Sequence, residues 1–211
     1  MDALRFTLEG VGPSDKHLIP ILAWALREQG VGIARGNFAR WDMLPNRPKT
    51  IVEKIVAGLG LYECDLLFVH RDADQFDPNP RREEVLKAVI EANIRVPAVP
   101  VIPIQETEAW LLIDQKALRR AANYPNGRCE INLPSLKNIE KCRDPKMALQ
   151  RVLREASEQS PQRLKRFDIP SAIAKVVDHI SDFRPLRNLT AFKNLELDLA
   201  VLKENGWKSV S

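Results

Sequence analysis

The sequence predicts an α/β protein in which helices flank a parallel sheet, and three observations support this. Short apolar runs of strand length alternate with longer segments whose apolar residues recur every three or four positions. Such alternation is typical of parallel sheets, because the chain must cross back over the sheet between strands. Acidic clusters follow three of the apolar runs, and the chain beyond residue 123 has a mostly helical pattern. We therefore expect a helical C-terminal extension.

Four segments are expected to form strands: residues 3–9, 31–34, 65–70 and 96–104. The run 65–70 is the clearest, because it is short, apolar and bounded by polar residues. The run 96–104 contains Pro97, Pro100 and Pro103. Proline has no backbone N–H to donate to a neighbouring strand, so this strand is expected either at the margin of the sheet or with a partly irregular course.

Helices are expected between and after these strands, from residue 13 to 26 and over 50–59, 81–93 and 106–122. Residues 124–134 are rich in Pro, Gly and Asn and are expected to form a loop. We place a domain boundary there, with an α/β domain over 1–123 and a basic helical extension over 124–211. The extension is expected to contain helices at 145–158, 160–167, 171–180 and 186–203.

The composition is that of an ordinary globular protein, with 45% hydrophobic and 28% charged residues among 211. Three cysteines without a CxxC pair argue against a disulfide framework and a cysteine-based zinc site. No run reaches transmembrane length and no signal peptide is apparent, so a cytoplasmic protein is expected, with no membrane partner.

Charge is distributed unevenly. Residues 1–114 carry 13 Lys and Arg against 17 Asp and Glu, whereas residues 115–211 carry 19 against 11. An acidic half joined to a basic half suits a polyanionic substrate that is brought to a metal ion. The basic residues Arg143, Lys146, Arg151 and Arg154 would form a cationic flank on one helix, which either binds a nucleic-acid backbone or is only a solvated face.

The acidic clusters are the strongest indication of chemistry. Glu9 ends the first strand, Asp72 and Asp74 follow the third, and Glu106 and Glu108 follow the fourth. The carboxyl ends of parallel strands meet at one edge of the sheet, where open α/β sheets bind their ligands. Crowded carboxylates repel one another unless a hard cation neutralises them, so we expect Mg²⁺ or Mn²⁺ there.

Blander interpretations exist for parts of this pattern. The pair Asp72 and Asp74 also suits a solvated turn, and Glu106 also suits the positively polarised start of a helix. Lys16 and Arg71 would contact a substrate phosphate or pair with the local carboxylates. The conjunction of three clusters favours the metal site.

These residues also carry a family resemblance. The strand followed by Glu9-Gly10, then Asp15-Lys16, then a strand and Asp72-x-Asp74 resembles the TOPRIM domain of topoisomerases, primases and OLD-type nucleases. The stretch 104–114, which contains Glu-x-Glu-Ala-Trp-Leu, is similar to that of a small bacterial TOPRIM-like family of unknown function. Members of that family are often encoded beside ABC or OLD-like ATPases in phage-defence contexts.

The resemblance implies roles for these side chains. Glu9, Asp72 and Asp74 would bind Mg²⁺, and Glu9 would also transfer a proton. Glu106 or Glu108 would be a further ligand or would orient one. The chain lacks the domains with which topoisomerases present their tyrosine, so nuclease chemistry is the implied outcome.

The leading hypothesis is therefore a metal-dependent nuclease that hydrolyses phosphodiesters of DNA or RNA. The alternative is a non-catalytic adaptor or effector subunit that docks on an ATPase of the ABC or OLD-like kind. The chain has no GxxxxGK[ST] loop, so any ATPase activity would belong to another chain. A third, weaker hypothesis is hydrolysis of a small phosphate ester.

Overall fold

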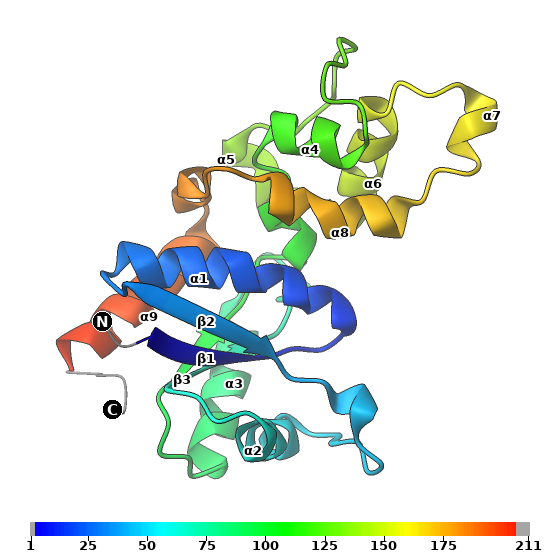
Figure 1. Ribbon diagram of the computed structural model, residues 1–211. Coiled ribbons are helices and arrows are strands. Elements are labelled where there is room, and N and C mark those ends of the chain that lie inside the picture. Colours follow the sequence, from blue (N-terminus) through cyan, green and yellow to red (C-terminus); the bar gives the residue numbers. More distant parts are fainter. Residues whose placement is uncertain (1–2, 206–211) are drawn as a thin grey trace. The chain divides into compact units, whose positions relative to one another are not determined.

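The computed structural model describes residues 3–205. Within this range one sheet contains four parallel strands: β1 (Ala3–Glu9), β2 (Ile33–Phe38), β3 (Leu66–His70) and β4 (Ala98–Val101). Their order across the sheet is β2-β1-β3-β4, and all three neighbouring pairs are parallel. Helices flank the sheet, so the predicted α/β class is confirmed (Figure 1).

The chain forms two compact units, and neither is continuous in sequence. The first comprises 1–73, 77–102 and 193–211, and the second comprises 74–76 and 103–192. The boundary expected at residues 123–124 lies inside the second unit. That expectation came from loop composition, whereas the units are defined by which segments pack together.

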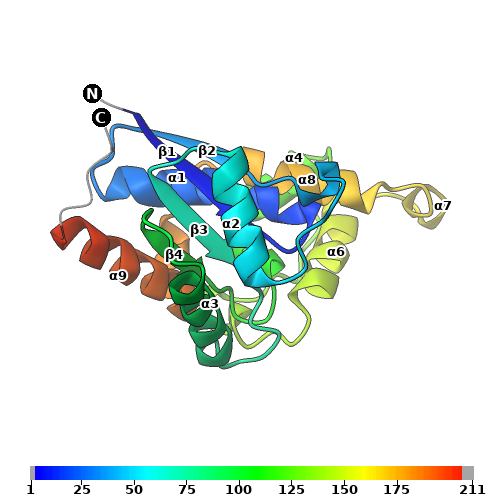
Figure 2. The ribbon, with the colours of Figure 1, turned by 90° about the horizontal axis from the view of Figure 1, so that it is seen from below.

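The first unit contains the sheet and its helices. These are the 3₁₀ helix η1 (Pro13–His17), α1 (Leu18–Glu28), η2 (Trp41–Met43), α2 (Ile51–Leu61), α3 (Asn79–Glu91) and, from residue 193 onward, α9 (Thr190–Glu204). Figure 1 shows α1 and α9 on one side of the sheet and α2 and α3 on the other. Figure 2 looks onto the side of α2 and α3.

Alternation along the strands decides which residues meet which helices. Leu67 and Val69 of β3 pack with Ile55 of α2 and Val85 of α3 in one buried cluster. Side chains of a strand alternate between the faces of a sheet, so even-numbered residues of β3 lie on the side of α1. Because the pairing aligns Glu9 with Val69, Glu9 faces α2. His70 faces the start of α1.

The margins of the sheet also follow from the sequence. Strand β4, which contains Pro100, is an edge strand, as expected. It spans only 98–101 rather than 96–104. At the other edge, β2 begins at Ile33 instead of residue 31 and runs to Phe38. Gly36 of β2 has no room for a side chain, because the ring of Phe6 occupies the position that its Cβ would take.

The second unit is helical. It contains η3 (Thr107–Leu111), α4 (Gln115–Ala121), α5 (Leu136–Ile139), α6 (Pro145–Ala156), α7 (Pro161–Leu164), α8 (Ile169–His179) and η4 (Arg184–Asn188). Helices α4, α6 and α8 pack against one another. Trp110 is fully buried, and its ring packs edge-on against that of Phe192.

The single helix expected over 106–122 was wrong. Gln105 has a positive φ of 63°, Glu106 is extended, and only a 3₁₀ turn follows. A separate helix, α4, then starts where the Asp114 side chain accepts hydrogen bonds from the N–H groups of Lys116 and Ala117. Apolar periodicity ran through both segments, whereas this N-cap marks a new start.

Within the described residues, no helix is both long and apolar enough to cross a membrane.

Candidate active site

Two of the predicted residues, Glu9 and Arg71, meet at the carboxyl ends of β1 and β3. These strands are neighbours, although β2 lies between them in sequence. From β1 the chain proceeds first to β2 on one side and then to β3 on the other. Open α/β sheets bind ligands at such a reversal, just outside the carboxyl ends of the strands. The sequence predicted a ligand site at this edge but not between which strands the reversal falls.

Glu9 ends β1 as a fully buried carboxylate with two cationic partners. The guanidinium Nη1 of Arg71 lies 3.4 and 3.2 Å from Oε1 and Oε2, and Nζ of Lys54 lies 3.7 Å from Oε1. Burial raises the pKa of Glu9 above its ordinary value, while the charges of Arg71 and Lys54 act in the opposite direction. A buried carboxylate is thus held by protein cations where a metal ion was expected.

A second group of charges surrounds His70, whose side chain is fully buried. Its Nδ1 lies 3.1 Å from Oδ2 of Asp15, and its Nε2 lies 3.3 Å from Oδ1 of Asp72. Burial alone would lower the pKa of His70, but hydrogen bonds to the two carboxylates outweigh it and raise the pKa to about 9. The ring is therefore an imidazolium at neutral pH, with both nitrogens donating.

Asp15 is anchored by the backbone as well as by His70. Its Oδ2 accepts hydrogen bonds from the N–H groups of Val11, at 2.6 Å, and Gly12, at 3.1 Å. Burial would raise the pKa of Asp15, but His70 and these N–H groups reverse the effect and lower it. A Cβ on Gly10 would lie 2.7 Å from the same oxygen. The glycine after Glu9 is thus required by close packing, since any side chain would displace Asp15.

The two groups touch through Arg71, whose Nη1 also donates to the backbone oxygen of His70 at 2.7 Å. Counting His70 as charged, three carboxylates at this edge face three cations. Sequence reasoning missed Lys54, because nothing in the pattern of α2 indicates that its side chain reaches β1. Asp15 was noted only within a motif, and its contact with His70 joins residues 55 positions apart.

The remaining predicted residues are placed as follows. Lys16 is exposed on η1, next to the buried Asp15. Asp74 and Glu108 belong to the second unit. Asp74 has a positive φ of 56°, and its N–H bonds to the backbone oxygen of Gln105. That Asp74 and Glu108 bind a metal ion stays a prediction.

Glu106 lies at the start of a helix, but not the one expected. Its Oε2 accepts a hydrogen bond from the N–H of Lys146, 3.1 Å away, in the first turn of α6. A carboxylate there satisfies an N–H that has no partner within the helix and complements the helix dipole. Arg143 and Lys146 are exposed beside this contact. Whether Glu106 also binds a metal stays a prediction.

Carboxylates such as Glu9 and Asp72 are suitable magnesium ligands. The described residues contain no group of three or more His, Cys, Asp or Glu side chains arranged to hold a metal ion. Mg²⁺, however, usually takes one or two carboxylates and completes its shell with water and substrate oxygens. The donor set therefore fits an ion that binds together with an anionic substrate, provided that Arg71 and Lys54 release Glu9.

A cavity of about 360 Å³ opens next to Glu9, within the first unit. Its lining includes Gly10, Phe38, Trp41, Arg47 and Lys54. Lys54 thus contacts Glu9 and also lines the cavity. Two cations and two aromatic rings suit a ligand with a phosphate and a flat ring.

Comparisons of the chain with protein-family models, curated proteins and solved structures found no match. The function must accordingly be argued from the chemistry of the site.

Proposed function

We propose that this chain is a metal-dependent nuclease that hydrolyses phosphodiesters of DNA or RNA at the carboxyl ends of β1 and β3. The observation that supports it most is the position of Glu9 and Asp72. Each follows one of two adjacent parallel strands, at the point where the strand order reverses. Glu9 and Asp72 are the residues that would hold Mg²⁺ or Mn²⁺.

The pairing of charges suggests how substrate and metal would bind together. In the free protein, Arg71 and Lys54 neutralise Glu9. A phosphodiester carries a negative charge that competes for these cations, and Arg and Lys both bind phosphate well. When they turn to the phosphate, Glu9 loses its partners and becomes available to a divalent ion. Substrate binding would therefore create the metal site.

The other residues have supporting roles in this scheme. His70 holds Asp72 in place through Nε2 and is itself held by Asp15 through Nδ1. The cavity beside Lys54 would take the nucleotide next to the scissile phosphate, with Trp41 and Phe38 against its base. A bound Mg²⁺ would supply an activated water and stabilise the charge that develops on the phosphoryl oxygens.

Cleavage assays with carboxamide variants test the proposal. Single- and double-stranded DNA and RNA are incubated with wild type, Glu9→Gln and Asp72→Asn in Mg²⁺ or Mn²⁺. Each variant should lose cleavage by about 100-fold or more, because its amide is a much weaker ligand for the ion. Asp65→Asn is the matched control, because Asp65 is a buried carboxylate that bonds the N–H of Arg5 at the opposite end of the sheet. Its cleavage should be retained.

If Glu9→Gln cleaves as well as wild type, hydrolysis occurs elsewhere and the proposed site is wrong. Equal losses in all three variants would show that the amides act through stability, which thermal unfolding of each variant measures directly.

A non-catalytic adaptor that docks on an ATPase subunit is the second candidate. The observation that favours it is that Glu9, Asp15 and Asp72 all contact protein cations, as structural carboxylates do. An adaptor predicts that wild type cleaves none of these substrates and that Glu9→Gln still binds its partner. A nuclease predicts instead that wild type cleaves a substrate and that Glu9→Gln loses this cleavage even where it still binds.

A further inference from the structure

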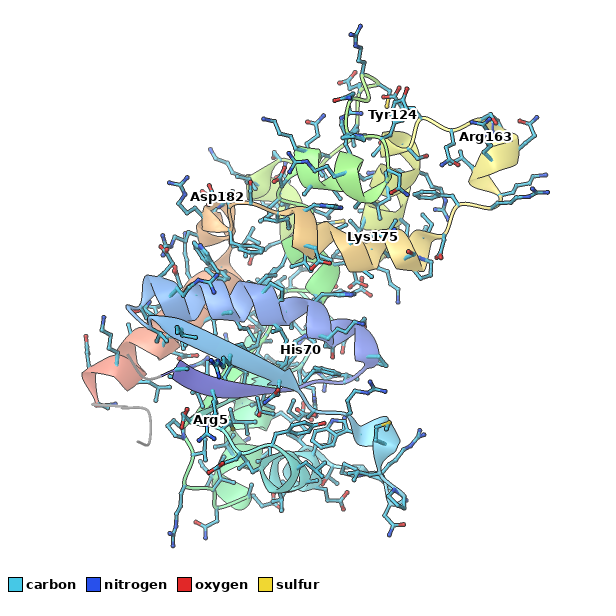
Figure 3. All side chains as sticks on the ribbon, viewed as in Figure 1. Arg5, His70, Tyr124, Arg163, Lys175 and Asp182 are labelled. Carbon is cyan, nitrogen blue, oxygen red and sulfur yellow. The ribbon has the colours of Figure 1, made fainter. Side chains whose placement is uncertain are left out.

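A basic pocket of about 410 Å³ lies in the second unit, and none of its lining residues belongs to the candidate active site. It is formed by the end of α4, by α7 with the residues that follow it, and by the first turns of α8. Three cations line it, Arg163, Arg166 and Lys175, and Asp168 is the one acidic residue in the lining. Figure 3 labels Arg163 on α7 and Lys175 on α8. We call this cavity the α7–α8 pocket.

Local structure explains why these side chains share one pocket. Ser171 and Lys175 lie four residues apart in α8, so they occupy the same face of the helix. Helix α4 ends at Ala121, and Asn123, which follows it with a left-handed φ of 58°, is part of the lining. Arg163 and Arg166 come from α7 and the turn after it.

The charge of the pocket is not balanced from within. Arg163, Arg166 and Lys175 are exposed, and no carboxylate pairs with any of them in the part of the chain that the structure describes. Asp168 is already engaged as the N-cap of α8, where Oδ1 accepts from the N–H of Ser171 at 3.0 Å. Ser171 and Ala172, in the first turn of α8, also line the cavity. The pocket therefore has an excess of about two positive charges.

We propose that the α7–α8 pocket binds a phosphomonoester, and specifically the terminal phosphate of a nucleic-acid strand. A phosphomonoester carries a charge of about −1.5 to −2 at neutral pH, which matches this excess better than the single charge of a phosphodiester. Phe167, which also lines the pocket, offers an aromatic surface for the adjoining nucleotide. The choice of a nucleic acid rests on the proposed function, whereas the phosphate chemistry rests on the pocket alone.

Binding of oligonucleotides that differ only at their ends tests the proposal. Strands of one sequence carry a 5′-phosphate, a 3′-phosphate or hydroxyl groups at both ends, with the fluorescent label on an internal base. Anisotropy is measured in EDTA, so the strands stay intact whether or not the protein is a nuclease. Wild type should bind one phosphorylated strand about tenfold more tightly than the hydroxyl strand, because a dianion gains charge-assisted hydrogen bonds.

Two variants and two controls place this preference. Arg166→Ala and Lys175→Ala should each remove most of the phosphate preference and leave binding of the hydroxyl strand nearly unchanged. Arg128→Ala and Lys137→Ala remove the same charges from exposed positions of the second unit outside the pocket, and should retain the preference. All four side chains are exposed, so folding should be unaffected, as thermal unfolding will verify.

Equal binding of all three strands by wild type would overturn the proposal, and so would equal losses in pocket and control variants. Competition with nucleoside monophosphates identifies the source of the phosphate. If a nucleoside monophosphate displaces the strand at the concentration at which the strand itself half-saturates the protein, the ligand is a free nucleotide. The strand-end proposal is then wrong. If wild type cleaves none of the substrates but keeps its preference for a phosphorylated end, only the proposed nuclease activity is refuted.

Discussion

The cations of two charged regions of this chain differ in whether a carboxylate pairs with them. At the carboxyl ends of β1 and β3, Arg71 and Lys54 contact Glu9, and His70 bridges two aspartates; Glu9 and His70 are fully buried. In the α7–α8 pocket the cations are exposed and have no carboxylate partner among the described residues. The first region holds its charges in a neutral, buried network, and the second presents them to solvent.

The difference shows what each region can bind. A paired charge must exchange its partner to bind a ligand, so the first region suits a ligand that brings an anion and a cation together. An unpaired exposed cation binds an anion without such exchange, and the cost of desolvation is small. The same residue types therefore support selective, coupled binding in one unit and direct anion binding in the other.

Removing the centre of the buried network should have the largest effect. His70→Ala leaves Asp15 buried without its imidazolium and removes the partner of Asp72. We expect a loss of about 3–5 kcal/mol in the free energy of unfolding, as for one partner of a buried ion pair. Urea titration followed by circular dichroism measures it. Lys175→Ala should change stability by less than about 0.5 kcal/mol, and similar losses in both variants would erase the contrast between the regions.

The same network should make stability depend on pH. The pKa of His70 is about 9 in the folded protein and 6.5 ordinarily. A pKa that is raised on folding means that the contribution is complete below about pH 6.5 and is lost as pH rises to about 9. Urea midpoints measured in EDTA between these values should therefore fall with pH. His70→Gln should lack this component, and an identical slope in both proteins would contradict a charged His70.

A pair of glycine variants tests how tightly the network is packed. Gly10→Ala places a methyl group against Asp15 and should destabilise the fold by about 1–3 kcal/mol, as overpacking does. Gly60→Ala adds the same group in α2, where no atom lies within 4 Å, and should stabilise by about 0.5–1 kcal/mol through helix propensity. Differential scanning calorimetry compares the two. Stabilisation of both would show that Asp15 moves aside freely.

Local pattern accounts for much of the architecture. Apolar periodicity predicted the order of strands and helices, and the prolines in and around β4 predicted its edge position. Where the pattern was wrong, a polar detail decided the outcome: Asp114 capped a new helix inside the stretch expected to form one. Periodicity reports which face of a segment is buried, and it is insensitive to a short interruption between two helices that keep the same buried face.

The candidate site divides in the same manner. That Glu9 and Asp72 lie at the same edge of the sheet followed from strand–helix alternation, because all strands of a parallel sheet have their carboxyl ends at one edge. That β1 and β3 are neighbours was decided by the fold. The partners of these carboxylates did not follow. Lys54 of α2 meets Glu9, and His70 meets Asp15 of η1, only because these elements pack on opposite faces of the sheet. Those contacts join residues far apart in sequence, and their distances and burial set the charge of each group, so only the folded chain could decide them.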